Sequence, residues 1–149
     1  TRERRLEIMR DSRIGSYGTV GLILLIGLRW LGLATLAELE AIGAVIVVAM
    51  ASRMAPVALM AWLPAARPDG LGAQGKGVGA ARVMPAVLLG GLPMLLLPQG
   101  WTALGVAAFA VAALAVIAWR KLRGQTGDVL GAGQQVAEAA MLLTLGAHA

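Results

Sequence analysis

Long apolar runs separated by short polar stretches dominate the pattern of this chain. Five such runs cover roughly residues 17–37, 39–63, 83–97, 101–119 and 129–145. About 20 residues at a rise of about 1.5 Å per residue are enough for a helix to cross a bilayer. The third run is shorter and contains Pro85 and Pro93, so we expect a kinked or tilted span there. The pattern therefore predicts an all-α protein, a multi-pass transmembrane helical bundle with about five spans.

The polar stretches predict the rest of the organisation. Residues 1–16 are charged, which suits a short helix on the membrane surface. Glycine and proline are frequent from residue 64 to 82, which argues for a loop. A second loop is expected at 120–128. We therefore divide the chain into a charged segment, 1–16, and a membrane domain, 17–149.

Lysine and arginine are distributed unevenly over these segments. The stretches 1–16, 64–82 and 120–128 carry five, three and three of them, whereas the intervening turns near 38–41 and 98–100 carry none. Cytoplasmic loops of membrane proteins are enriched in these cations. The N-terminus and both loops are therefore expected in the cytoplasm.

Composition agrees with a membrane protein. Of 149 residues, 58% are hydrophobic and only 14% are charged, and the mean hydropathy is +0.77. The net charge of +5 comes with only 4% aromatic residues, so no base-stacking surface is predicted and nucleic acid is not an expected partner. Membrane lipid is. The absence of cysteine excludes disulfides, thiolate metal ligands and thiol catalysis.

Polar residues within the last apolar run are the strongest functional signal. Asp128, Gly131, Gln135 and Glu138 follow one another at steps of three, four and three, which places them along one stripe of a helix. Hydrocarbon rejects such groups. The stripe therefore predicts a protein partner, water or a ligand near one membrane face.

The segment that precedes this run is rich in glycine, from Gly124 to Gly127. Free backbone N–H groups at a helix start favour an anion. The alternative is that Thr126 or Asp128 caps the helix, which leaves the deeper polar residues unexplained.

The cationic segment at the first span offers similar chemistry. Arg10 and Arg13 are suited to hold a phosphate and Asp11 a divalent metal, with Ser12 between them. The alternative is a helix cap flanked by arginines that touch lipid headgroups.

Two further cations are ambiguous. Arg53 follows Ser52 inside a span, where it either snorkels to the surface or faces a polar cavity that binds an anion. Lys76 lies between two glycines without the full spacing of a phosphate loop. It belongs either to a flexible linker or to a loop that closes over a phosphate.

Two blocks of the chain resemble the cobalamin synthase family, the adenosylcobinamide-GDP ribazoletransferases. They are residues 4–18 (RRLEIMRDSRIGSYG) and 124–131 (GQTGDVLG), with Glu138 following. The resemblance implies an inner-membrane enzyme of late vitamin B12 assembly, with its active site in the cytoplasm. Such an enzyme joins adenosylcobinamide-GDP to α-ribazole or its 5′-phosphate, releases GMP and uses Mg²⁺.

The resemblance also implies roles for individual residues. Asp11 and Asp128 are the expected catalytic and metal-binding carboxylates. The expected substrate- or phosphate-binding residues are Arg10, Ser12, Arg13, Ser52, Arg53, Lys76, Gln125, Thr126 and Glu138.

Family members carry an aspartate-rich motif upstream of the segment with which this chain begins. We therefore expect the chain to be the C-terminal portion of the enzyme, with the main Mg²⁺ site in the N-terminal part. That part is an expected partner, and the chain alone is expected to be inactive.

Two other functions remain open. One is a different membrane phosphotransferase that joins a nucleotide-activated donor to an alcohol, although its spaced aspartate signature is not found. The other is a transporter subunit with helices broken at Pro85 and Pro93. Inverted repeats would support a transporter, and none is evident between the two halves of the chain.

Overall fold

The computed structural model describes residues 1–11, 13–67 and 80–147. Its regular structure there is helical apart from one isolated β-bridge. The elements are α1 (Arg2–Ile8), α2 (Ser16–Glu38), α3 (Ile42–Ser52), α4 (Met54–Trp62), α6 (Ala80–Ala86), the π-helix η1 (Val87–Gly91), α7 (Leu92–Leu95), α8 (Gly100–Leu122) and α9 (Gly127–Ala147). The predicted all-α class is confirmed.

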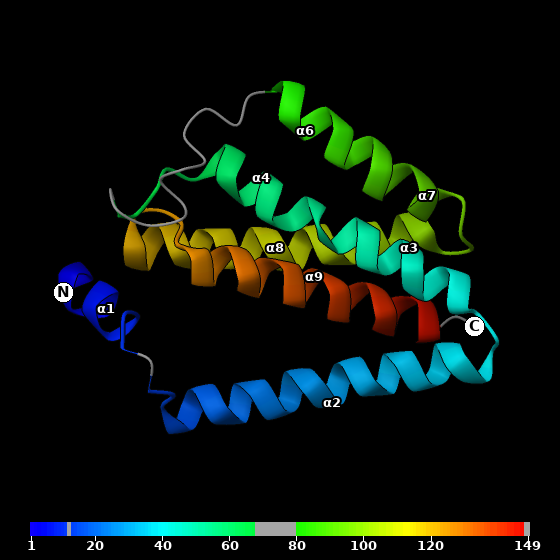
Figure 1. Ribbon diagram of the computed structural model, residues 1–149, viewed down its shortest axis with the longest axis horizontal. Coiled ribbons are helices and arrows are strands. Elements are labelled where there is room, and N and C mark those ends of the chain that lie inside the picture. The colour runs from blue at the N-terminus through cyan, green and yellow to red at the C-terminus, as the bar shows by residue number, and fades with distance from the viewer. Residues whose placement is uncertain (12, 68–79, 148–149) are drawn as a thin grey trace.

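The long helices run between the same two ends of a bundle, and α9 lies at its centre (Figure 1). Helix α9 contacts α2 on one side and α3, α4 and α8 on the other. Small residues permit this close packing. A Cβ on Gly32 of α2 would lie 2.7 Å from the Cβ of Leu142 in α9.

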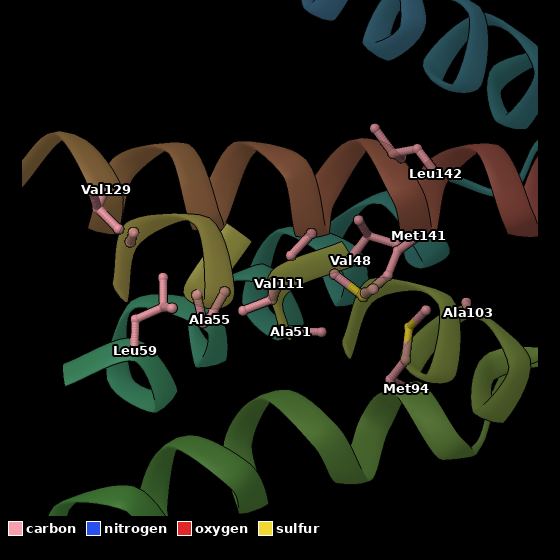
Figure 2. Close-up of a cluster of buried hydrophobic side chains, with 14 of the residues drawn as sticks. Val48, Ala51, Ala55, Leu59, Met94, Ala103, Val111, Val129, Met141 and Leu142 are labelled. Atoms are coloured by element: carbon pink, nitrogen blue, oxygen red, sulfur yellow. The ribbon is translucent and has the colours of Figure 1, made fainter. Parts of the chain in front are cut away.

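The core lies between α9 and the helices α3, α4 and α8 (Figure 2). Its fully buried large side chains include Val48, Leu59, Met94, Met141 and Leu142. Much of the remaining core is alanine, which lets neighbouring helices approach closely, as is common in membrane bundles. The packing therefore fixes α9, and with it the polar residues that α9 carries.

Among the described residues, three helical stretches are long and apolar enough to cross a membrane: Ser16–Glu38, Ile42–Trp62 (α3 with α4) and Gly100–Leu122. They correspond to three of the predicted spans. The segment Val83–Leu95 is apolar but shorter. Helix α9 has 21 residues and is not among the three candidate spans.

The span predicted at 39–63 begins later, at Ile42, and is broken in the middle. Helix α3 ends at Ser52, and α4 begins at Met54. Pro56 explains the break, because it has no N–H to donate to the carbonyl four residues earlier and its ring crowds that carbonyl. The break places Arg53 at a helix junction rather than inside a continuous helix.

The third run, predicted to be a kinked or tilted span, is not a continuous α-helix. A π-helix, η1, occupies Val87–Gly91, just before Pro93 of α7, which cannot donate to the carbonyl of Leu89. This stretch approaches α3 and α4 closely. A Cβ on Gly90 would lie 3.0 Å from the Sδ of Met54.

The polar segments agree in part with prediction. Residues 1–13 do contain a short helix, α1. The turn at 98–100 contains Gln99 with a φ of 58°. Most of the loop predicted at 64–82 lies outside the described residues, and α6 begins at Ala80.

Candidate functional site

Two loops at one end of the bundle are paired through their backbones. The N–H of Ala66 donates to the carbonyl of Gln125, and the N–H of Gln125 donates to the carbonyl of Pro64, each over 2.8 Å. Gly124 makes this approach possible, because a Cβ there would collide with the Pro64 carbonyl oxygen and lie 2.9 Å from the Ala66 nitrogen. The glycine-rich segment thus forms a fixed junction.

This junction leads directly into α9. Gln125 and Thr126 are buried, and the Thr126 hydroxyl accepts a hydrogen bond from the N–H of Val129 over 3.4 Å. Thr126 is therefore the helix cap that the sequence left as one alternative. Asp128 lies exposed in the first turn, where the helix dipole favours a carboxylate.

Helix α1 is held against this junction by arginine side chains. The Arg2 guanidinium donates from Nε to the carbonyl of Leu122 and from Nη2 to that of Ala66, both over 2.7 Å. Arg67 donates to the carbonyl of Leu6 over 2.6 Å. These charged donors satisfy carbonyls at the end of α8 and in the paired loops.

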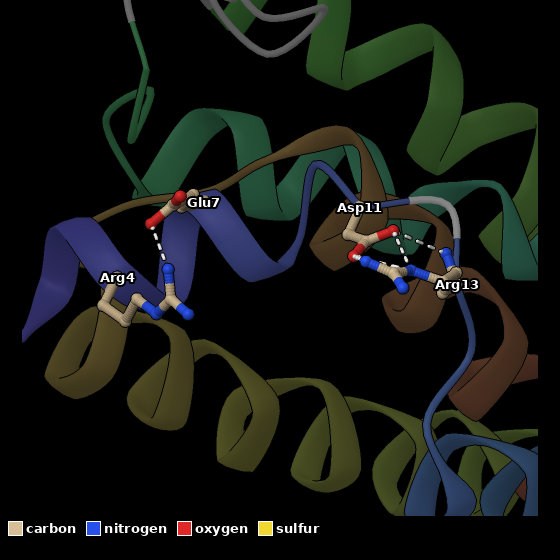
Figure 3. A network of polar contacts seen from close by, with 4 residues as sticks. All are labelled: Arg4, Glu7, Asp11 and Arg13. Atoms are coloured by element: carbon tan, nitrogen blue, oxygen red, sulfur yellow. Dashed lines mark hydrogen bonds and ion pairs between the residues drawn. The ribbon is translucent and has the colours of Figure 1, made fainter.

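The segment after α1 carries two of the predicted binding residues, Asp11 and Arg13, side by side (Figure 3). Arg13 forms an ion pair with Asp11 over 3.0 Å, and its backbone N–H donates to the same carboxylate. The Arg13 hydrogen bonds hold the pKa of the Asp11 carboxyl below its ordinary value. Arg4 forms a separate pair with Glu7 over 2.7 Å. Arg13 is thus already engaged with a carboxylate.

A cavity of about 540 Å³ lies beside this segment, between α1 and residues 66–67. Its charged lining residues are Arg2, Arg10 and Arg67 on the positive side and Glu3 and Glu7 on the negative side. Because arginines outnumber carboxylates, the cavity is suited to an anionic group such as a phosphate.

The segment between α1 and α2 and the start of α9 lie at the same end of the bundle (Figure 1), and together they carry six predicted residues. We call this set the loop-end cluster: Arg10, Asp11, Arg13, Gln125, Thr126 and Asp128. Ser12 and Lys76, two other predicted binding residues, lie outside the described residues.

Ser52 and Arg53 do not join the loop-end cluster. Ser52 is fully buried, and its hydroxyl donates to the carbonyl of Ala49 over 2.9 Å. Arg53 is exposed at the α3–α4 junction, about 15 Å along the helix from its loop end.

Glu138 is also distant from the loop end, about 16 Å along α9 from its first residue. Its carboxylate forms an ion pair with Arg29 of α2 over 2.7 Å, and Arg29 also donates to the Oε1 of Gln135. The Glu138 side chain is only 13% exposed and that of Arg29 32%. The part of the polar stripe formed by Gln135 and Glu138 therefore has a protein partner.

No partner for Glu138 was predicted from the sequence, and Arg29 was not among the predicted site residues. The sequence does contain a signal for this pair, because an arginine inside one apolar run and a glutamate inside another are expected to pair in a membrane. We call Arg29, Gln135 and Glu138 the mid-bundle cluster.

The loop-end carboxylates do not make a complete metal site. Within the described parts of the chain, no three His, Cys, Asp or Glu side chains are grouped closely enough to hold a metal ion. Asp11 is engaged with Arg13. A divalent metal at this end would therefore need ligands in addition to Asp11 and Asp128.

The fold is that of a helical membrane protein, with arginines gathered in the segments at one end of its bundle. The family model described as CobS, cobalamin-5-phosphate synthase, matches residues 1–146. The chain belongs to this family.

Curated relatives support the assignment. A protein of Bradyrhizobium diazoefficiens named adenosylcobinamide-GDP ribazoletransferase is 43% identical over 151 residues, which cover 99% of this chain and 58% of that relative. A protein of the same name from Mesorhizobium japonicum is 41% identical over 96% of this chain and 56% of its own length. One from Chlorobium phaeovibrioides is 36% identical over 97% of this chain and 61% of its length.

The chain thus spans somewhat more than half the length of these relatives. No solved structure matches it.

Proposed function

We propose that this chain forms part of an adenosylcobinamide-GDP ribazoletransferase, which joins adenosylcobinamide-GDP to α-ribazole or its 5′-phosphate and releases GMP. The observation that carries the proposal is the family match over residues 1–146. The convergence of the predicted phosphate-binding and carboxylate residues at the loop end supports it. The transporter and general phosphotransferase alternatives have no comparable observation in their favour.

The chemistry is attack on a diphosphate. An acceptor oxygen forms a bond to the phosphorus on the cobinamide side, the bond from that phosphorus to the bridging oxygen breaks, and GMP leaves with the bridging oxygen. Positioning and neutralisation of negative charge lower the barrier to such a transfer. The guanidiniums of Arg10 and Arg67 at the loop-end cavity are proposed to hold the diphosphate.

The acceptor must also lose its proton. We assign this role to Asp128, whose carboxylate is exposed at the start of α9. Asp11 is proposed to orient Arg13 toward the substrate through the ion pair between them. Thr126 fixes the first turn of α9 that carries Asp128.

Mg²⁺ is part of the proposal as a charge-neutralising ion, with Asp11 and Asp128 as two of its ligands. The described residues do not form a complete metal site, so the remaining ligands are proposed to come from the part of the enzyme that this chain does not match in its relatives. The chain's own contribution to the reaction rests on its fixed charges and on Asp128.

We further propose that five helical spans cross the inner membrane: α2, α3–α4, α6–α7, α8 and α9. Residues 1–16 and the loops at 64–82 and 120–128 are proposed to face the cytoplasm. The arginines at the loop end support this orientation, since the opposite turn near Glu38 and Glu40 carries no lysine or arginine.

Release of GMP tests the function. The purified chain is mixed with adenosylcobinamide-GDP, α-ribazole and Mg²⁺ in detergent. A second protein joins it to the part of the Bradyrhizobium relative that it does not match. Release by the joined protein supports the transferase. No release from a joined protein that is folded by circular dichroism contradicts it.

A further inference from the structure

A second crevice at the loop end differs in character from the phosphate-suited cavity. It has a volume of about 320 Å³ and lies where α1 crosses α8 and the start of α9. Its lining is almost wholly apolar and includes Ile8 at the end of α1, Met9 directly after it, and Leu114 and Ile117 of α8. The proposed transfer reaction makes no use of it.

Cations border this apolar lining. Arg5 and Lys121 line the same crevice, and no acidic side chain is among the described residues that line it. The Arg5 guanidinium donates to the carbonyl of Lys121 over 3.4 Å, so it lies against the backbone of the residue that supplies the second cation. An apolar floor with a positive rim is complementary to an amphipathic anion.

The crevice lies beside the last turns of a candidate membrane span. Helix α8 is a candidate membrane span, and Lys121 is in its last turn. Ile117, one turn earlier, is 57% exposed and belongs to an apolar outer face of α8 that includes Phe109 and Val116. The apolar floor is therefore continuous with the surface that contacts lipid tails, and the cations lie where headgroups begin.

We propose that this crevice binds one anionic phospholipid, with an acyl chain against Ile117 and Leu114 and the headgroup phosphate between Arg5 and Lys121. The lipid holds α1 at the membrane surface, next to the segment that carries Asp11 and Arg13. The proposal does not depend on the transfer reaction.

Lipid-dependent thermal stability tests the proposal. The full chain in neutral detergent is titrated with phosphatidylglycerol or with phosphatidylcholine of the same acyl chains, and native mass spectrometry counts the retained lipid. We expect phosphatidylglycerol to raise the Tm and to be retained as a single molecule, with phosphatidylcholine doing neither. Equal effects of the two lipids would overturn the proposal.

Two matched double variants separate a site from general attraction. Arg5→Gln with Lys121→Gln removes the rim and should weaken phosphatidylglycerol binding by roughly thirtyfold. Arg4→Gln with Arg120→Gln changes the net charge equally at residues that do not line the crevice, and should leave the binding near that of the unmodified chain. Equal weakening by both variants would show a diffuse charge effect instead.

Two further measurements keep the test decisive. Lys121→Gln alone spares the Arg5 hydrogen bond and should retain part of the effect. Ile117→Trp fills the crevice without changing charge and should abolish lipid retention; unchanged retention would contradict the acyl-chain position. If glycerol phosphate raised the Tm as much as the lipid does, the site would bind a soluble anion rather than a phospholipid.

Discussion

The two polar regions of this molecule differ in how their arginines are engaged, although Arg13 at the loop end is also paired with a carboxylate, that of Asp11. At the loop end, Arg2 and Arg67 donate to backbone carbonyls, and Asp128 is exposed at the first turn of α9. In the mid-bundle cluster, Arg29 is bound to Glu138 and Gln135 on the neighbouring helix. An arginine bound to a neutral carbonyl still presents a net positive charge to a nearby anion. The charge of an arginine bound to a carboxylate is compensated by its partner.

This difference separates the region that we propose to be reactive from a structural one. The loop end has backbone pairing for rigidity and charges that can act on a bound anion. The mid-bundle cluster has its charges compensated within the protein, which is what apolar surroundings require. We therefore propose that the loop end carries the chemistry and that the mid-bundle cluster holds α2 against α9.

The largest expected effect comes from uncoupling the mid-bundle pair. Glu138→Leu leaves the Arg29 guanidinium without its counter-charge in a largely apolar environment, which we expect to lower the free energy of unfolding by about 3–5 kcal/mol. Denaturant unfolding in micelles measures this. The double variant Arg29→Met, Glu138→Leu removes both charges and should recover most of the loss. A double variant as unstable as the single one would contradict the structural role.

The next effect concerns the paired loops. Gly124→Ala introduces a Cβ against the backbone of Pro64 and Ala66, and we expect a loss of about 1–3 kcal/mol in unfolding free energy. Gly131→Ala is the control, since a Cβ there meets nothing within 4 Å. It should stabilise α9 by about 0.5–1 kcal/mol. Equal effects of both changes would show that the loops are not closely paired.

A smaller effect is expected for the attachment of α1. Arg2→Gln removes charged hydrogen bonds to Leu122 and Ala66. Because the Arg2 side chain is 40% exposed, we expect a loss of only about 1 kcal/mol. Hydrogen exchange should increase at the Gln125 and Ala66 amides. Arg4→Gln, which removes an exposed pair with Glu7, should leave exchange at those amides unchanged.

The smallest effect is a titration. Arg13 holds the Asp11 pKa below its ordinary value near 3.8, so Arg13→Gln should raise that pKa toward 3.8, measured by carboxyl NMR. The lowered folded pKa means that the pair's contribution to stability is present above the ordinary pKa and is lost as pH falls through the lowered one. An Asp11 pKa unchanged in the variant would show that Arg13 is not its partner.

The sequence predicted the long helices well, because apolar runs of membrane length leave few alternatives. It did not predict where the second span breaks, because the effect of Pro56 on the Ser52 carbonyl depends on whether neighbouring helices tolerate a bend there. The close pairing that requires Gly124 was also not predicted, because it joins loops that are far apart in sequence.

The candidate site was predictable only in part. Asp11, Thr126 and Asp128 were predicted as site residues from their residue types. The segments that carry all three lie at one end of the bundle (Figure 1). The partner of Glu138 was missed, because the stripe on α9 shows that a partner is needed and not which helix supplies it. Arg29 was visible in the sequence, but only the parallel packing of α2 and α9 brings it opposite Gln135 and Glu138.

The most direct test of the central claim compares the two regions in one assay. The rate of GMP release is measured for the chain joined to the remaining part of its relative, with Asp128→Asn at the loop end or with Arg29→Met and Glu138→Leu together in the mid-bundle. We predict a loss of at least about a hundredfold for the first variant and a nearly unchanged rate for the second. Loss of activity in the folded mid-bundle variant, with Asp128→Asn still active, would contradict the account.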